Sequence, residues 1–472
     1  MRVSAPGKVL ITGGYLVLEP EFSGAVIAAS SRFHTTVSLE PLDESNQANE
    51  DGVAVRVRSP QFHQTMHGRL TATAFHFTDA TENPYVEKTI HVCVAALSGL
   101  LGHDSFAARI EEIRRANQCI AITLEADNDF YSQREQLERR GLHVSRKHLA
   151  TLPRFLPSLL DDAGRAKIAK TGMGSSAALI TSLVGALLGF FNAADIPSTA
   201  HDDENTRKGV QIVHNLAQIC HSIAQEKIGS GFDVSAASYG NQRYTRFRPD
   251  GIQAFLNGGA IDPVALAARI AAPWDNIVRP FCLPEGMHMI MGDVNAGSAT
   301  VSMVRKVLAW KTADPEGSAA LWKALNAKNE AIPAGFERIA AHLSQSNSLE
   351  ALSRLPASEW TAADATVGAL LVDLRQTFVD VRSHLREMGT LAGVPIEPAD
   401  QTALIDATMQ VPGVLFAGVP GAGGNDAIFA IVLHESVLDK VEQFWSTWTA
   451  TSVSALLVDA APNGWQGGLL RE

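Results

Sequence analysis

The sequence predicts an α+β fold in two domains, and three observations support this prediction. The chain has 472 residues, more than one typical hydrophobic core organises. Alternating apolar residues near the N-terminus indicate strands, and longer stretches with helical spacing follow them. Near the C-terminus, the order strand, turn, strand, helix and strand favours an antiparallel sheet backed by helices. We place the two domains at residues 1–250 and 251–472.

The first half of the chain contains the clearest strand patterns. Residues 2–18 are expected to form two strands, because Pro6-Gly7 and Gly13-Gly14 interrupt the apolar pattern. The acidic run at residues 43–52 is expected to be an exposed loop. The other strands expected in this half lie at residues 25–39, 53–59, 71–77, 120–124 and 241–248.

Helix signals alternate with these strands. Asn83 and Pro84 form a cap and a first helical residue, and apolar residues at helical spacing continue to Leu101. Asp202 or Asp203 is expected to cap a helix that reaches about Lys227. The second half is expected to contain strands at 287–294, within 414–435 and at 451–459, and helices within 293–310 and at about 317–331, 359–388, 398–409 and 437–448.

Composition and charge limit the classes of function. The formal charge is −11, from 39 Lys and Arg against 50 Asp and Glu, which argues against nucleic acid or a membrane surface as partner. The N-terminus lacks a signal-peptide pattern and the most apolar stretch, 177–191, is too short to span a membrane, so we expect a cytoplasmic location. We expect a monomer or weak dimer. Buried thiols are expected at the scattered cysteines Cys93, Cys119, Cys220 and Cys282.

A glycine loop at residues 170–174 organises the chemistry. It carries Gly172 and Gly174 and is followed by Ser175, Ser176 and a long apolar helix. Glycines allow a tight turn, and the loop and helix start then offer N–H groups and hydroxyls to one anion, so a phosphate would fit there. An ordinary glycine-serine cap on a buried helix explains the same residues about equally well.

Lys8 and Asp233 are the candidate charged groups of the site. Lys8 follows a Pro-Gly turn and precedes an apolar strand, which would direct its ammonium into a site, although a solvated lysine is the commoner case. Asp233 has apolar neighbours and nearby glycines, and a carboxylate in such surroundings needs a partner or a task. A turn cap is the alternative for Asp233, and Lys8 is the cation that we place beside it.

Two further segments and two histidines each allow more than one interpretation. The stretch DNDFYSQ, residues 127–133, follows a strand and could serve a site or be a capped helix start. The stretch 293–306 offers hydroxyls and basic residues as a second anion site, although a serine cap explains the hydroxyls almost as well. His214 and His221 are interpreted as packed histidines, because no carboxylate partner follows at metal-ligand spacing.

Three stretches together resemble a known superfamily. SAPGKVLITGGY, KTGMGSSAA and GVPGAGGNDA lie near the start, centre and end of the chain, and their order is similar to the three motifs of the GHMP kinases. The stretches DNDFYSQ, KIGSGFDV and GDVNAGSAT most resemble the eukaryotic-type phosphomevalonate kinase family. This resemblance implies an N-terminal ribosomal-S5-like domain and a C-terminal ferredoxin-like domain with the active site between them. It also implies Mg²⁺ and ATP as cofactors and 5-phosphomevalonate as substrate, with 5-diphosphomevalonate and ADP as products.

The resemblance also implies residue roles. Lys8 and Asp233 would be catalytic, with Asp233 orienting Lys8, and a hydroxyl of Ser175 or Ser176 would lie near the Mg²⁺. The residues implied in ATP binding are Lys170, Gly172, Met173, Gly174, Ser175, Ser176 and Ala177. Those implied in substrate binding are Tyr131, Ser132, Gly231, Ser298, Thr300, Arg305, Gly421, Gly423 and Gly424.

Two positions depart from the family pattern, and three other functions compete. Glu226 stands where the family has a glycine, and Asn425 stands where a more apolar residue is expected.

The first rival is another kinase of the superfamily, for mevalonate or a sugar, whose hydroxyl acceptor would need Asp233 as a base. The second is a catalytically silent sensor of ATP or a metabolite, against which the presence of Lys8 and Asp233 argues. A diphosphomevalonate decarboxylase relative is a weaker alternative.

Overall fold

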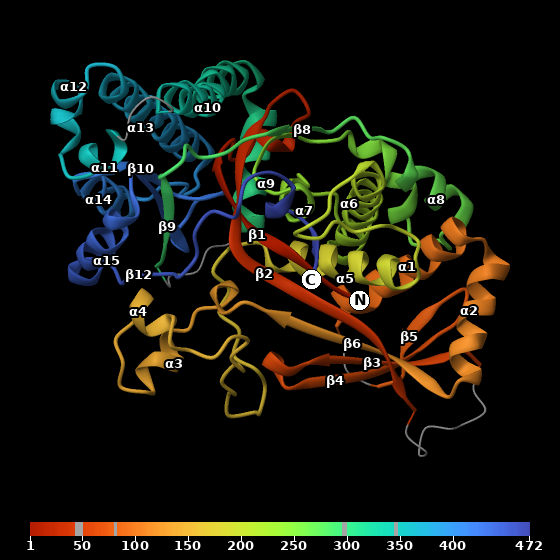
Figure 1. Cartoon of the computed structure of the whole chain (residues 1–472). Helices are drawn as coiled ribbons and strands as arrows, with labels where there is room; N and C mark the ends of the chain where they lie inside the picture. The colour runs from red at the N-terminus through yellow and green to blue at the C-terminus, as the bar shows by residue number, and fades with distance from the viewer. Residues whose placement is uncertain (43–50, 80–82, 295–299, 344–347) are drawn as a thin grey trace.

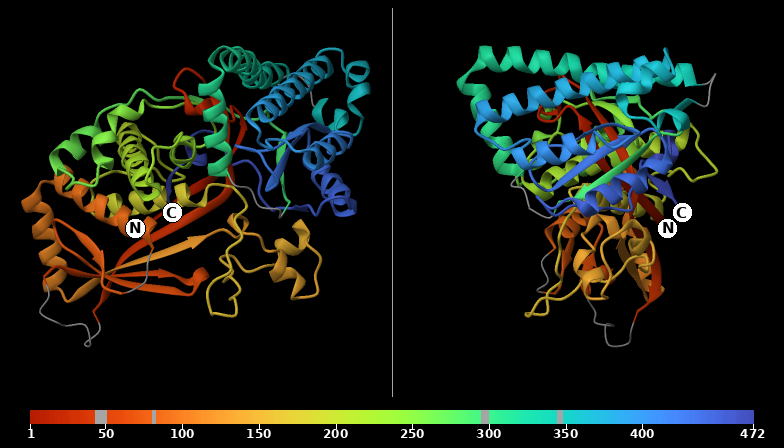
Figure 2. Two further views of the ribbon diagram at one scale, coloured as in Figure 1. Left: turned by 180° about the vertical axis from the view of Figure 1, so that it is seen from behind. Right: turned by 90° about the vertical axis from the view of Figure 1, so that its left-hand side faces the viewer.

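The structure is a computed structural model of the chain, and it describes residues 1–42, 51–79, 83–294, 300–343 and 348–472. Helices cluster around two sheets (Figure 1). The N- and C-termini lie close together beside the first sheet in both views of Figure 2, where residues 470 and 471 pair with the first strand. The expected loop at 43–52 lies mostly outside the described residues.

The first sheet has nine strands in the described part of the chain. Its main path runs in the order β13-β1-β2-β6-β3-β4-β5, while β7 pairs with β2 and β8 with β7. All neighbours are antiparallel except β3 and β6. The strands are β1 (Arg2–Thr12), β2 (Gly24–Pro41), β3 (Val53–Ser59), β4 (Gln64–Leu70), β5 (Phe75–Phe77), β6 (Gln118–Ala126), β7 (Gln242–Thr245), β8 (Ile277–Pro280) and β13 (Leu470–Arg471).

Two expected features of this sheet are wrong. Pro6-Gly7 does not break the first strand, because β1 continues through it with an irregularity in register between Pro6 and Lys8. The strand ends before Gly13, and a 3-10 helix at Leu16–Leu18 replaces the second expected strand. The expected strand at 71–77 is mostly a turn that joins β4 to β5.

The helices of the first half pack on this sheet and on one another. α5 packs on β1 and β2, and α1 packs against α5, α6 and α8. Asn83 caps α1 and Asp203 caps α6 in a capping box, as the sequence predicts. These helices are α1 (Pro84–Leu101), α2 (His103–Arg115), α3 (Arg134–Glu138), α4 (Arg146–Leu149), α5 (Ser175–Phe190), α6 (Glu204–Gln225), α7 (Phe232–Tyr239) and α8 (Pro263–Ala271).

The second sheet is antiparallel, with four strands in the order β10-β11-β9-β12 in the described residues. Numbered along the chain, this order is 2-3-1-4, which is the ferredoxin-like arrangement that the resemblance implies. Helices lie between its first and second strands, and α15 (Leu438–Thr447) lies between its third and fourth. The strands are β9 (His288–Asp293), β10 (Val414–Gly418), β11 (Ala427–Val432) and β12 (Ser454–Ala455).

Several elements of the second half differ from their expected limits. The helix expected at 317–331 runs over α10 (Pro315–Leu343) and includes Pro333. The helix expected at 359–388 is two helices, and the last expected strand, 451–459, is reduced to β12. The remaining helices are α9 (Thr300–Ala313), α11 (Ser348–Leu352), α12 (Trp360–Ala363), α13 (Val367–Ala392) and α14 (Ala399–Thr408).

Some strands of the first sheet come from beyond residue 250. β8 and β13 both belong to it, so the strands do not separate at the expected domain boundary. The thiols also differ from expectation, because Cys282 is exposed while the other three are buried. Within the described residues, no single helix is long and apolar enough to cross a membrane, although α1 and α2, bent by 119°, meet the criterion by length and composition together.

Candidate active site

Three segments far apart in the sequence meet around a cavity of about 560 Å³, here called the central cavity. Besides β1 with its following turn, the glycine loop and the turn between β10 and β11, two more segments line it, namely the end of α6 with the start of α7, and α9. The lining residues are Lys8, Leu10, Tyr15, Val17, Leu18, Gly172, Gly174, His221, Gln225, Lys227, Gly229, Ser230, Phe232, Asp233, Val304, Arg305, Leu308, Pro420, Gly421, Ala422, Gly423, Asp426 and Ala427.

The N-terminus of α5 follows the glycine loop. Gly172 and Gly174 have φ angles of 78° and 76°, a left-handed conformation that costs glycine little. The Ala178 N–H donates to the Gly174 carbonyl at 3.2 Å and begins the helical ladder. The amides of the first three residues of α5 precede this ladder and lie at the positive end of the helix dipole, where a phosphate binds favourably.

Lys8 lies at the irregularity of β1 and is tied to the glycine loop. Its backbone N–H donates to the Met173 carbonyl at 2.9 Å, and its ammonium Nζ donates to the Gly172 carbonyl at 2.8 Å. Burial lowers the pKa of Lys8, while the negative charge of Asp233 opposes that shift. An ammonium has three N–H donors, so the bond to Gly172 leaves two for a ligand.

Asp233 lies in the first turn of α7 and converges with Lys8. A Cβ atom added at Gly174 would lie 3.1 Å from Lys8 Cε and 3.8 Å from Asp233 Cβ, so both side chains flank the glycine loop. Asp233 Oδ1 accepts a hydrogen bond from the Val234 N–H at 3.0 Å. The predicted pairing of Lys8 with Asp233 in one site is therefore present in the structure.

Gly231 shapes the turn before α7. Its φ is 78°, and a Cβ there would lie 2.7 Å from Gln218 Oε1 and 2.9 Å from the Tyr244 hydroxyl. Gln218 Nε2 donates to the Gly231 carbonyl at 2.7 Å, and the Tyr244 hydroxyl donates to the Ser230 carbonyl at 2.9 Å. The buried side chains of Gln218 and Tyr244 thus fix the backbone that carries Asp233.

His221 is a site residue that the sequence reasoning missed. It lies on α6, lines the central cavity, and its Nε2 is 3.2 Å from Ser176 Oγ and 2.7 Å from Gln225 Nε2. Its Nδ1 is 3.9 Å from Asp233 Oδ2. Burial lowers the pKa of His221, and the charge of Asp233 opposes this. The interpretation as a packed histidine holds for His214, which is fully buried and whose pKa burial lowers to about 4.

The third motif closes the cavity through backbone contacts with the first. The Tyr15 hydroxyl donates to the Ala422 carbonyl at 2.7 Å, and the Gly421 N–H donates to the Leu10 carbonyl at 3.1 Å. Gly421 and Gly423 line the cavity, while the Gly424 N–H donates to the Ile396 carbonyl at 2.8 Å. Strand β1 is therefore joined directly to the turn between β10 and β11.

The charges in the central cavity are of both signs. Lys8, Lys227 and Arg305 supply positive charge, and Asp233 and Asp426 supply negative charge. Arg305 comes from α9, as the sequence predicts for a basic residue near the site. Three cations in one cavity favour a ligand with several negative charges.

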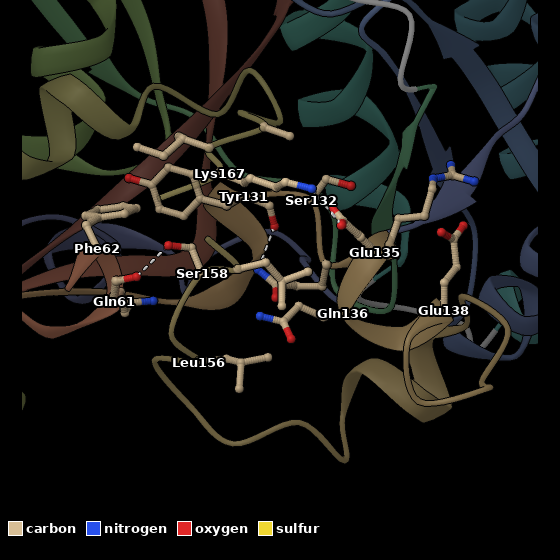
Figure 3. Close-up of a pocket in the computed structure, with 15 residues that line it drawn as sticks. Gln61, Phe62, Tyr131, Ser132, Glu135, Gln136, Glu138, Leu156, Ser158 and Lys167 are labelled. Atoms are coloured by element: carbon tan, nitrogen blue, oxygen red, sulfur yellow. Dashed lines mark hydrogen bonds and ion pairs between the residues drawn. The ribbon is translucent and has the colours of Figure 1, made fainter. Parts of the chain in front are cut away.

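Tyr131 and Ser132 lie in a second cavity, here called the flanking cavity, of about 540 Å³ (Figure 3). The Tyr131 ring packs edge-on against Phe62, with centroids 5.2 Å apart. Burial raises the pKa of Tyr131 to about 12, and a side-chain hydrogen bond with Ser175 opposes the shift. Ser132 donates to Asp293 Oδ2 at 2.6 Å. The flanking cavity is thus a different one from the central cavity, which is lined by Arg305, the residue that the resemblance groups with Tyr131 and Ser132 in substrate binding.

The other predicted residues lie around these two cavities. Lys170 is exposed and forms a β-bridge with Tyr131. The Met173 side chain is buried in the main hydrophobic core, and its backbone carbonyl accepts the hydrogen bond from the Lys8 N–H. Ser298 lies outside the described residues, and α9 begins at Thr300.

No protein-family model matches the chain. A peroxisomal phosphomevalonate kinase of Arabidopsis thaliana is 35% identical, and the match covers 98% of this chain and 94% of that protein. A phosphomevalonate kinase of Gibberella zeae is 33% identical, with 98% and 96% covered. The chain belongs to the phosphomevalonate kinase family. The family lies in the GHMP kinase superfamily, as the resemblance indicates.

The fold agrees with this family. A structure of Streptococcus pneumoniae phosphomevalonate kinase in complex with phosphomevalonate and AMPPNP has a TM-score of 0.52, with 14% identity and coverage of 97% of this chain and 99% of that chain. The likeness confirms the predicted α+β GHMP-kinase fold.

The two departures from the family pattern have different surroundings. Glu226 ends α6 with φ at 57°, a left-handed conformation that suits the family's glycine, and its exposed side chain pairs with Lys88 at 2.9 Å. Its charge is therefore neutralised by Lys88 rather than directed at the site for anions. Asn425 lies half-buried in the turn between β10 and β11.

Proposed function

We propose that this chain transfers the γ-phosphoryl group of ATP to the phosphate of 5-phosphomevalonate. The bond between the γ-phosphorus and the β,γ-bridging oxygen breaks, a bond to an acceptor phosphate oxygen forms, and ADP leaves. The single observation that carries this proposal is the full-length similarity to phosphomevalonate kinases. The cluster of Lys8, Lys227 and Arg305 supports it, because a phosphate acceptor brings more negative charge than a hydroxyl acceptor does.

The nucleotide would lie across both cavities. We place its phosphates at the N-terminus of α5 and its base in the flanking cavity, whose wall includes Phe62 and Tyr131. The β-bridge between Tyr131 and Lys170 supports this placement, because it joins the flanking cavity to the glycine loop. Tyr131 and Ser132 would then serve the nucleotide rather than the mevalonate group.

The acceptor would enter the central cavity. Lys8 would stabilise the charge on the transferring group, and Lys227 and Arg305 would hold the acceptor phosphate. Asp233 would orient Lys8 and need not be a strong base, because a phosphate monoester is largely ionised at neutral pH, with a second pKa of about 6. Gly421 and Gly423 would form the floor near the acceptor.

Mg²⁺ fits this site as an ion held mainly by the phosphates. No group of three His, Cys, Asp or Glu side chains in the described residues forms a metal site by itself. Magnesium commonly keeps several waters and takes only one or two protein ligands beside phosphate oxygens. The Ser176 hydroxyl, half-buried beside His221, is better placed than the hydroxyl of Ser175, which is buried. When bound, the ion would neutralise phosphate charge.

Residues 1–250 would form the ATP-binding domain and residues 251–472 the second domain. The strands β8 and β13 would then be extensions of the second domain that complete the first sheet.

Release of ADP tests the function directly. With Mg-ATP, we expect turnover on 5-phosphomevalonate and none on mevalonate, homoserine or galactose in a coupled assay. Turnover on mevalonate instead would overturn the substrate, although it would keep the roles of Lys8 and the glycine loop. ATP binding without turnover on any acceptor would favour a sensor.

A further inference from the structure

A third cavity, here called the outer cavity, adjoins the central cavity and has no role in the proposed reaction. It measures about 920 Å³ and lies between α1, the C-terminal end of α6 and the segment 246–261. Helices α1 and α6 pack together, and α6 also packs against the 3-10 helix Gln253–Leu256 (Figure 1). This volume is in the range of small-molecule sites.

Part of its wall is apolar. Phe255, Leu256 and Ile261 come from the segment after β7, and Ile223 and Ile228 come from the end of α6 and the turn beyond it. All five side chains are half-buried and pack against the main core. Binding of an apolar group about the size of these side chains would therefore remove apolar surface of the wall from water, which is favourable.

The wall also carries charged residues, namely Lys88, Lys227 and Arg246 together with the carboxylates of Glu87 and Glu226. Lys88 is already paired with Glu226 at 2.9 Å, but the described residues give Lys227 no carboxylate partner. Arg246 is only 7% exposed, and its Nη1 and Nη2 donate to the carbonyls of Leu18 at 2.5 Å and Gly229 at 2.7 Å. Its buried Nε has no hydrogen-bond acceptor among the described residues. A buried donor without a partner is costly, so an anionic oxygen there would be stabilising.

Two of these cations, Lys227 and Arg246, connect the outer and central cavities. Lys227 lines both. Arg246 holds the carbonyls of Leu18 and Gly229, and these two residues line the central cavity. An anion that draws Lys227 outward would remove positive charge from the central cavity.

We propose that the outer cavity binds an amphipathic anion, with its apolar body against Phe255 and Ile261 and a phosphate or carboxylate head at Lys227 and Arg246. Binding weakens the affinity of the central cavity for a phosphorylated acceptor. The effect on turnover rests on the proposed function, whereas the binding itself does not.

Calorimetry of the full chain with n-octyl phosphate, below its micelle concentration, tests the binding. The wild type binds the probe, and saturation with Mg-AMPPNP does not displace it. Ile261→Asp weakens binding at least tenfold, because a carboxylate then faces the probe. The matched control is Val264→Asp, at a residue of α8 that is 73% exposed and outside the lining of the outer cavity, and it changes binding less than twofold. n-Octanol, without the charge, binds at least tenfold more weakly.

A kinetic arm tests the coupling. Octyl phosphate raises the KM for 5-phosphomevalonate at least threefold in the wild type and in Val264→Asp, but not in Ile261→Asp. Absence of binding to the wild type, unchanged binding in a folded Ile261→Asp, or displacement by Mg-AMPPNP would overturn the site. Binding without a change in KM would overturn the coupling. A chain with no turnover at all would refute the proposed function, while the calorimetry would still decide the site.

Discussion

Two helices begin at the central cavity, and their N-termini are built differently. Both α5 and α7 follow a glycine with φ near 77°, Gly174 and Gly231, and neither has a side-chain cap. A Cβ at Gly172, in the loop before α5, would meet nothing within 4 Å. A Cβ at Gly231 would instead strike the buried Gln218 and Tyr244.

The site keeps the positive end of one helix for a ligand, whereas the positive end of the other helix is satisfied within the protein. The first turn of α7 carries Asp233, whose carboxylate accepts from the Val234 N–H. This carboxylate neutralises the dipole of α7. The first turn of α5 carries only hydroxyls, so an incoming phosphate supplies the negative charge there. Lys8 lies between the two ends and is attracted by Asp233.

The largest expected effect comes from removing the cation between the two helix ends. Lys8→Met should lower kcat by about 10²–10³-fold, because the transferring phosphoryl group loses its main preorganised charge. The measurement is steady-state ADP release with 5-phosphomevalonate. Lys323→Met, at an exposed lysine of α10, is the matched control and should be silent. Near-native turnover in Lys8→Met would refute the role of Lys8.

The two glycines should respond differently to substitution. Gly174→Val should weaken Mg-ATP binding by about 100-fold, because a side chain at a left-handed φ would distort the loop beside Lys8. Gly231→Ala should mainly destabilise the fold, by about 1–3 kcal/mol, through its contact with Gln218. Calorimetry with AMPPNP and urea unfolding separate the two effects. Native ATP affinity in Gly174→Val would mean that the loop is only a helix cap.

The two hydroxyls of α5 should also differ. Ser176→Ala should lower kcat/KM by about tenfold and raise the Mg²⁺ concentration needed for half-maximal rate, because this hydroxyl faces His221 beside the central cavity. Ser175→Ala should change the rate less, since the Ser175 side chain is buried. A greater Mg²⁺ requirement in Ser175→Ala than in Ser176→Ala would reverse this assignment.

His288 lies away from the N-termini of α5 and α7, so its substitution should change only the stability of the fold. His288 Nδ1 lies 2.6 Å from Asp459 Oδ2, and this hydrogen bond raises the pKa of His288. Because the pKa of His288 is raised in the folded state, protonated His288 stabilises the fold fully below its unfolded pKa of about 6.5. This stabilisation is lost as the pH rises through the pKa of His288 in the folded state. His288→Gln should therefore cost about 0.5 kcal/mol at pH 6 and less at pH 9. Urea unfolding at the two pH values measures this, and an equal cost at both would contradict it.

Much of the fold and site could be predicted because local signals agreed with the tertiary structure. The caps Asn83 and Asp203 and the glycine loop before α5 depend on short-range chemistry. Lys8 could be placed beside Asp233, far away in the chain, because a carboxylate among apolar residues needs a cation. His221 could not be found, because its role depends on how α6 faces the glycine loop. Pro6-Gly7 was misjudged as a strand break, because an irregularity in register absorbs it within a paired strand.

The most direct test of the account is a double-mutant cycle on Lys8 and Asp233. ADP release with 5-phosphomevalonate would be measured for Lys8→Met, Asp233→Ala and the double variant. We expect each single change to lower kcat by about 10²-fold or more. The double variant should be less than about tenfold slower than the slower single variant, because the two groups act as a unit. A double variant slowed by the full product of the two single effects would show independent roles and contradict the account.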